Sequence, residues 1–157
     1  MIQEMKKDAG FTLIEIVIVI VILGLLSTFA VPRIKSMVED ARLNSTKDEM
    51  MKIKMGIVGD ASAVSGGILT YRGYLGDVGA IPTSIQDLIT KPVGVSDWDR
   101  TANNGQGAGW NGPYIQSDDF DDAWENPYVL YPDSSIVSYG PNGVYDGGSG
   151  DDIVLYY

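Results

Sequence analysis

An almost uninterrupted apolar run from Phe11 to Val31, rich in Ile and Val, limits what this chain can fold into more than any other feature. As a helix, the run would span roughly 30 Å, which is enough to cross the hydrocarbon core of a bilayer. That core offers no hydrogen-bond partners to peptide groups, so we expect a helix there despite the many β-branched residues. The sequence therefore predicts one membrane-spanning helix near the N-terminus.

Glu15 places a carboxylate inside this apolar run, near its start. A carboxylate at the bilayer centre costs roughly 2.5–3.5 kcal/mol on insertion scales, so a functional role is a reasonable hypothesis. Two interpretations fit the residues. Glu15 is about a turn from the helix start, and its side chain can reach the headgroups. Alternatively, a cut between Gly10 and Phe11 would leave the free amine of Phe11 one turn from the carboxylate.

The N-terminal region as a whole resembles the signal of type IV pilins and type II secretion pseudopilins. The resemblance rests on Lys6-Lys7, on the motif Gly10-Phe11-Thr12-Leu13-Ile14-Glu15, and on an apolar helix that contains Gly24 and Pro32. It implies cleavage after Gly10 by a prepilin peptidase and N-methylation of Phe11. It also implies that Glu15 pairs with the Phe11 amine of a neighbouring subunit during assembly, which would relieve the desolvation of both charges.

We expect a cleaved leader, a transmembrane and assembly helix, a periplasmic half of the same helix, and a globular domain, over residues 1–10, 11–32, 33–59 and 60–157. Two lysines before the helix predict a cytoplasmic N-terminus, a single pass through the inner membrane and a periplasmic globular domain. Pro32 should interrupt or kink the helix. With Gly24 it brackets a segment that can lose helical order in filaments of the resembled family.

The remaining pattern predicts an α+β fold. The second half of the spine helix would pack under the globular domain, with an apolar stripe of Met51, Met55 and Val58. Thr83 to Gln86 matches a capping box that opens a short helix to Ile89. Strands are expected at 128–131, 136–139 and 153–157, with a long polar loop at 95–109. The result is a long N-terminal helix on a small antiparallel sheet.

Charge and composition exclude several classes of function. The formal net charge is −10, and the residues after Gly59 hold three basic and fourteen acidic side chains. Such an acidic domain argues against nucleic acid as a partner. The sequence contains no Cys and no His, which excludes thiol catalysis, disulfides, His-based acid–base chemistry and the usual zinc sites.

The C-terminal region resembles the globular domain of the major pseudopilin of type II secretion systems. The segments that carry this resemblance are 81–83, 110–115, 122–128 and 138–143. The family typically carries Asp-Pro-Trp-Gly-Asn-Pro-Tyr, from which Ala123 and Glu125 depart here. The resemblance implies a pilin fold, with a spine helix and a small antiparallel sheet closed by a calcium-binding loop.

Four side chains with hard oxygen donors, separated by glycines, make that loop a candidate calcium site: Asn142, Asp146, Asp151 and Asp152. Calcium takes six to eight such ligands in flexible geometry. The alternative on the residues alone is a solvated acidic turn. The resemblance favours calcium, with Asp151 at the family's second acidic position, Asp152 as the alternative in register, and a carbonyl from Tyr139. Asn142 falls where the family usually has Asp.

The expected function is that of a structural subunit, not an enzyme. It would polymerise into the pseudopilus of a type II secretion system and drive export across the outer membrane. Its partners would be further copies, the prepilin peptidase, minor pseudopilins and an inner-membrane assembly platform. The alternative is a type IV pilin on the cell surface, serving adhesion, motility or DNA uptake. The absence of a C-terminal Cys pair and the calcium-type loop favour the first.

A membrane-anchored enzyme is the hypothesis from a different class. A carboxylate cluster would carry its chemistry, formed by Asp118, Asp119, Asp121 and Asp122. No His, nucleophile or phosphate loop accompanies these residues, so we expect a solvated loop there.

Overall fold

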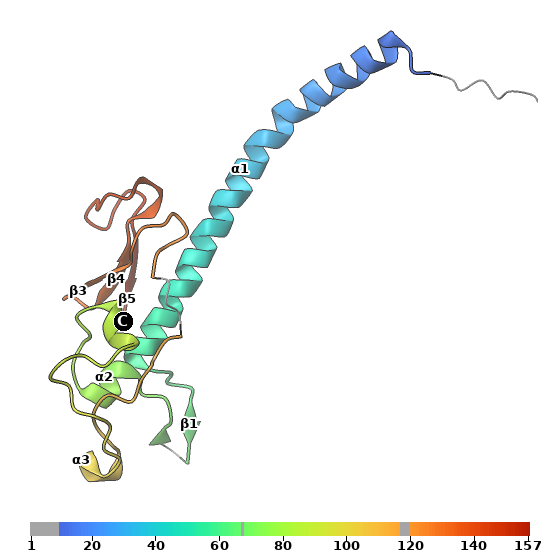
Figure 1. The fold of residues 1–157 in the computed structure, drawn as a ribbon. Coiled ribbons are helices and arrows are strands. Elements are labelled where there is room, and N and C mark those ends of the chain that lie inside the picture. Colours follow the sequence, from blue (N-terminus) through green and yellow to red (C-terminus); the bar gives the residue numbers. More distant parts are fainter. Residues whose placement is uncertain (1–9, 67, 117–119) are drawn as a thin grey trace, which may run out of the picture. The chain divides into compact units, whose positions relative to one another are not determined.

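The computed structural model describes residues 10–66, 68–116 and 120–157 (Figure 1). Its elements in chain order are α1 (Leu13–Val58), β1 (Val64–Ser65), β2 (Ile68–Leu69), α2 (Gly73–Val78), the 3-10 helix η1 (Ile85–Leu88), α3 (Ala102–Gly105), β3 (Val129–Tyr131), β4 (Ser135–Ser138), the 3-10 helix η2 (Gly140–Asn142) and β5 (Ile153–Tyr156). The chain divides into two compact units, 1–41 and 42–157, and α1 contributes residues to both.

In the first unit, α1 is helical from Leu13 onward, and the described residues, from Gly10 to Ala41, are all exposed. The predicted apolar helix is confirmed. It runs through Gly24 and Pro32 without ending at either residue. The loss of helical order expected between them concerns the assembled filament, and it stays a prediction.

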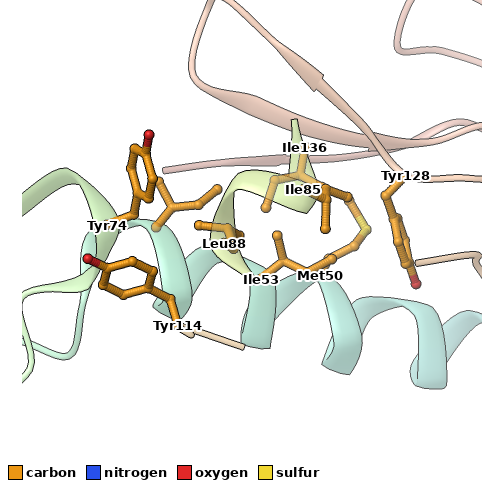
Figure 2. Close-up of a cluster of buried hydrophobic side chains, with 9 residues drawn as sticks. Met50, Ile53, Tyr74, Ile85, Leu88, Tyr114, Tyr128 and Ile136 are labelled. Carbon is orange, nitrogen blue, oxygen red and sulfur yellow. The ribbon is translucent and has the colours of Figure 1, made fainter. Parts of the chain in front are cut away.

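In the second unit, α1 buries one narrow face against the domain. Its buried residues recur at helical spacing: Thr46, Met50, Ile53, Gly56 and Ile57. Figure 2 shows Met50 and Ile53 of α1 among Ile85 and Leu88 of η1 and Ile136 of β4. Tyrosines from α2, from the segment after α3 and from the position just before β3 add to this core: Tyr74, Tyr114 and Tyr128.

The predicted stripe of Met51, Met55 and Val58 is wrong as the packing face, because all three side chains are exposed. The buried face lies one residue earlier, at Met50. Gly56 explains why this face of α1 packs against the domain. A Cβ there would lie 2.6 Å from Ile115 Cγ2 and 3.3 Å from the Tyr114 carbonyl oxygen. The domain approaches α1 where the helix has no side chain, and apolar spacing alone does not reveal this.

The three predicted strands are confirmed and form one antiparallel sheet in the order β3-β4-β5. Leu130, Ile136 and Leu155 are register partners, and they turn the same sheet face toward the core. The predicted short helix is also confirmed as η1. Its capping box uses Ser84 and Asp87, one position later than expected, since the Asp87 carboxylate accepts the Ser84 amide at 3.1 Å.

The 95–109 loop is attached to the domain by Arg72. The Arg72 guanidinium forms an ion pair with the buried Asp77 carboxylate at 3.1 Å and donates to the Gln106 carbonyl oxygen at 2.9 Å. It also lies 5.9 Å from the ring centre of Trp98. A buried carboxylate needs such partners to be tolerated. The loop therefore has a structural connection that its polar sequence did not predict.

Gly59 directly follows the last residue of α1, and its backbone is left-handed, with a φ of 81°. A Cβ on Gly59 would collide with the backbone of Tyr71 and Arg72. Gly79 ends α2 with nearly the same φ, 79°, but a Cβ there would meet no atom within 4 Å. The two glycines thus differ in steric surroundings while sharing the same backbone conformation.

We predict that Gly59→Ala destabilises the domain more than Gly79→Ala does. Left-handed backbone costs a residue with a Cβ roughly 1–2 kcal/mol, and both variants incur that cost. Only Gly59→Ala also displaces backbone atoms. The measurement is the melting temperature of the protein truncated to begin at Arg33, where about 1 kcal/mol corresponds to several degrees. Equal melting temperatures for the two variants would contradict the close approach at Gly59.

Candidate functional site

The Glu15 carboxylate caps the start of its own helix. The Thr12 amide and the Thr12 hydroxyl both donate to Glu15 Oε2 at 2.9 Å. The Glu15 amide donates back to Thr12 Oγ1 at 3.3 Å. This reciprocal arrangement is a capping box, with Thr12 before the first helical residue and Glu15 at the third. Sequence reasoning missed this role, although Thr-x-x-Glu is its standard signature.

Capping does not occupy the whole carboxylate, because both Thr12 donors reach the same oxygen. Glu15 Oε1 takes no part in these bonds. Gly10 and Phe11 precede the helix, and both are exposed. A Cβ on Gly10 would meet nothing within 4 Å, so packing in the described residues gives no reason for glycine there.

The segment between Gly24 and Pro32 has a weakened hydrogen-bond ladder. Pro32 has no amide proton to offer the carbonyl one turn earlier. Just before it, the Ser27 hydroxyl donates to the Leu23 carbonyl oxygen at 2.8 Å and the Thr28 hydroxyl to the Gly24 carbonyl oxygen at 3.1 Å. Such bonds from side chain to backbone often bend helices. The same helix is the one candidate membrane span found among the described residues, by its length and apolar composition.

The acidic loop from Gly140 to Asp152 brings its predicted residues together around the Asn142 amide. Asn142 Nδ2 donates to Asp146 Oδ2 at 3.0 Å and to Asp151 Oδ1 at 2.6 Å. The Asn142 backbone amide donates to Asp151 Oδ2 at 3.0 Å. Asp152 is oriented differently, since its Oδ2 accepts the amides of Asp146 and Gly148 at 2.8 and 2.9 Å. The Asp146 and Asp151 carboxylates thus share the Asn142 side-chain amide as a donor, and the Asp152 carboxylate binds the loop backbone.

These residues fit calcium in the kind of donor they offer. Asp152 Oδ1 is buried and has no hydrogen-bond partner among the residues that the structure describes, so it could serve a cation. Asp146 and Asp151 meet at one amide group, where a positive charge would neutralise both. In the described part of the chain, no three Asp, Glu, His or Cys side chains form a ready metal cluster. Backbone carbonyls would therefore have to supply most of the ligands, as the family resemblance implies.

The Asn142 amide has a defined orientation. Its Oδ1 accepts the Val144 amide at 2.6 Å, which turns the NH2 group toward the carboxylates. In this orientation the side chain offers them donors and would not act as a metal ligand. Tyr139, the other predicted ligand, precedes η2, and its hydroxyl lies 3.2 Å from that of Tyr131.

A buried carboxylate, Asp122, fixes the base of the loop. Its Oδ1 accepts the amides of Trp124 and Asn126, each at 2.9 Å, and its Oδ2 accepts the Ser138 hydroxyl at the end of β4. Asn126 Nδ2 then donates to the Gly140 carbonyl oxygen at 2.7 Å. Asp122 is therefore structural. Of the other carboxylates in the enzyme hypothesis, Asp118 and Asp119 lie outside the described residues, and Asp121 is exposed.

An aromatic cluster attaches the loop to the sheet, and sequence reasoning missed it. Tyr145 of the loop stacks on Tyr131 of β3 with ring centres 5.2 Å apart, and it lies 5.6 Å from Tyr139. The hydrogen bond with Tyr139 is the largest of the causes that raise the pKa of Tyr131 to about 12, so its phenol is neutral at physiological pH. The signal available in the sequence was Tyr145 itself, a lone aromatic residue in a loop of Gly and Asp residues.

Similarity to known proteins extends over nearly the whole chain. Residues 5–31 match the model of the prokaryotic N-terminal methylation motif, and residues 68–156 match that of type II secretion system (T2SS), protein G. A type II secretion system core protein G from Pseudomonas aeruginosa is 30% identical, covering 96% of this chain and 94% of the relative. Those of Klebsiella pneumoniae and Xanthomonas campestris are 31% and 27% identical, each covering 95% of this chain and 94% and 90% of the relative. No solved structure matches the chain significantly.

Proposed function

This chain belongs to the type II secretion system protein G family, and on that premise we propose that its N-terminal motif joins subunits into a filament and that its acidic loop binds calcium. The chain is a major pseudopilin, a structural subunit and not an enzyme. Its apolar helix is consistent with an anchor in the inner membrane. The matched globular domain is that of the secretion family, so we set the surface-pilus alternative aside.

The methylation motif implies processing by a prepilin peptidase. We propose that residues 1–10 are removed and that residues 11–32 anchor and then assemble the subunit. Residues 33–59 and the domain at 60–157 would lie in the periplasm. Filament growth would bring in the assembly platform and minor pseudopilins as partners.

The observation that supports the assembly role is the half-used carboxylate of Glu15. Thr12 satisfies Oε2, whereas none of the bonds found among the described residues uses Oε1. In an apolar filament interior a carboxylate is costly unless it is paired. Cleavage would give Phe11 of a neighbouring copy a cationic amine, which also needs a charge partner in that interior. The pairing would set the axial position of each subunit.

For the metal, Asp146, Asp151 and Asp152 carry the carboxylates that would hold calcium, with Tyr139 offering a carbonyl. The cation would neutralise the Asp146 and Asp151 carboxylates, which now meet at the Asn142 side-chain amide. Asn142 would have to turn its side chain to become a ligand, because its oxygen is engaged by Val144.

We predict that the mature protein begins at Phe11. Mass spectrometry of membrane-extracted protein should show loss of residues 1–10 and the added mass of one methyl group. Gly10→Val should leave the fold unchanged, since a side chain there meets no atom within 4 Å, yet it should block cleavage. An intact Met1 on unsubstituted, filament-incorporated protein would rule the assignment out.

We predict that Glu15→Gln separates capping from pairing. Glutamine also closes a capping box, so the variant should insert and keep its helix, but it lacks the charge and should assemble poorly. Thr12→Val is the matched control, because it removes the hydroxyl bonds and keeps the carboxylate, and it should still form filaments. The measurement is filament yield by electron microscopy. A Glu15→Gln yield equal to that of the unsubstituted chain would refute the pairing.

We predict that calcium raises the melting temperature of the protein truncated to begin at Arg33. A ligand that binds only the folded state stabilises it by roughly 2.7 kcal/mol at a hundredfold excess over Kd. Asp151→Asn should remove most of the difference between millimolar calcium and chelator. Asp60→Asn, an equal charge change at a turn outside the loop, should preserve it. An identical melting temperature in calcium and chelator would leave the loop a solvated acidic turn.

A further inference from the structure

The aromatic cluster described above has an open side. Tyr145 stacks on Tyr131, yet 47% of its surface is exposed, and its neighbour Val144 is 58% exposed. Exposed acidic side chains lie close in sequence on either side, at Asp133 before β4 and Asp146 after Tyr145. We call Tyr131, Tyr139, Val144 and Tyr145 the tyrosine patch. An apolar and aromatic surface among carboxylates suits a partner that combines apolar side chains with a cation.

The same chain carries such a surface on α1. Phe29, Arg33 and Met37 follow one another at four-residue spacing and share a helix face. Phe29 is 74% exposed and Met37 is 69% exposed. Arg33 is exposed too, and it has no ion-pair partner in the described part of the chain. This stripe is apolar at both ends and cationic in the middle.

Other basic residues fit less well. Arg72 and Lys91 already pair with Asp77 and Asp97. Lys54 donates to the Tyr156 carbonyl oxygen. Lys35 has Glu39 one turn away on its own face and lies on a different side of α1 from Arg33. Arginine also stacks on aromatic rings better than lysine does.

We propose that the tyrosine patch of one copy docks the Phe29–Arg33–Met37 stripe of a second copy. The Arg33 guanidinium would stack on the open face of Tyr145, with the exposed Asp133 carboxylate compensating its charge. The proposal rests on the function proposed above, since both surfaces must belong to copies of this chain. Two different surfaces that meet head to tail produce an open helical filament unless the rotation closes into a ring. The contact would therefore propagate a pseudopilus and not end in a dimer.

The absence of Cys allows a clean cross-linking test in the full-length chain. Two copies would be expressed together, one with Met37→Cys and one with Val144→Cys, and filaments would be oxidised and separated without reductant. A disulfide requires Cα atoms within about 7 Å, so only a direct contact should form it. We expect disulfide-linked dimers several-fold above those from the matched pair Lys35→Cys and Val144→Cys. Arg33→Glu should lower filament yield more than Lys35→Glu.

The outcomes separate this proposal from the proposed function. Filaments that form normally but show equal cross-linking for the Met37 and Lys35 pairs would overturn the docking alone. Strong cross-linking between copies that all carry Val144→Cys would mean that the patch meets itself, and it would also overturn the docking. Failure of the unsubstituted chain to form filaments would overturn the proposed function and the docking with it.

Discussion

The buried carboxylate of Asp122 holds together the parts of the domain that matter for its function. It accepts two backbone amides from its own turn and the Ser138 hydroxyl from the end of β4. The next residue, Ala123, donates its amide to Thr46 Oγ1 on α1 at 3.2 Å. A buried charge without such donors would cost several kcal/mol, so this turn has few alternative conformations. The part of α1 around Thr46, the sheet and the acidic loop are thus all connected through this turn.

α1 meets two different requirements along one helix. Up to Ala41 it keeps its side chains exposed, which suits the anchoring and assembly roles proposed for this segment. From Thr46 onward it buries at least one residue of each successive turn against its own domain. Met51, Met55 and Val58 stay exposed on the other side, so even this half retains apolar surface for contacts between copies.

Most of the fold followed from local sequence rules. The apolar run, the strand pattern and the short capped helix each carry a periodicity or a turn signal that a sequence displays. The buried face of α1 did not follow, because the sequence offers two apolar stripes and only the packing at Thr46 and Gly56 decides between them. The predicted residues Asn142, Asp146 and Asp151 do converge, and their role as metal ligands stays a prediction. The capping by Glu15 is local and could have been predicted from Thr-x-x-Glu, whereas the stacking of Tyr145 on Tyr131 is a long-range contact that residue spacing does not encode.

The acidic domain poses a problem for any filament built from it. Fourteen carboxylates against three basic residues after Gly59 mean that neighbouring domains repel one another. Salt screens such repulsion over about 8 Å at physiological ionic strength, but domains in contact lie closer than that. Assembly therefore needs cations at the contacts themselves. A calcium ion in the loop and Arg33 from α1 of the next copy would both supply them, one from solution and one from the chain. Between Arg33 and Lys54, α1 carries more basic than acidic side chains, so it can offset the negative charge of a neighbouring domain where two copies meet.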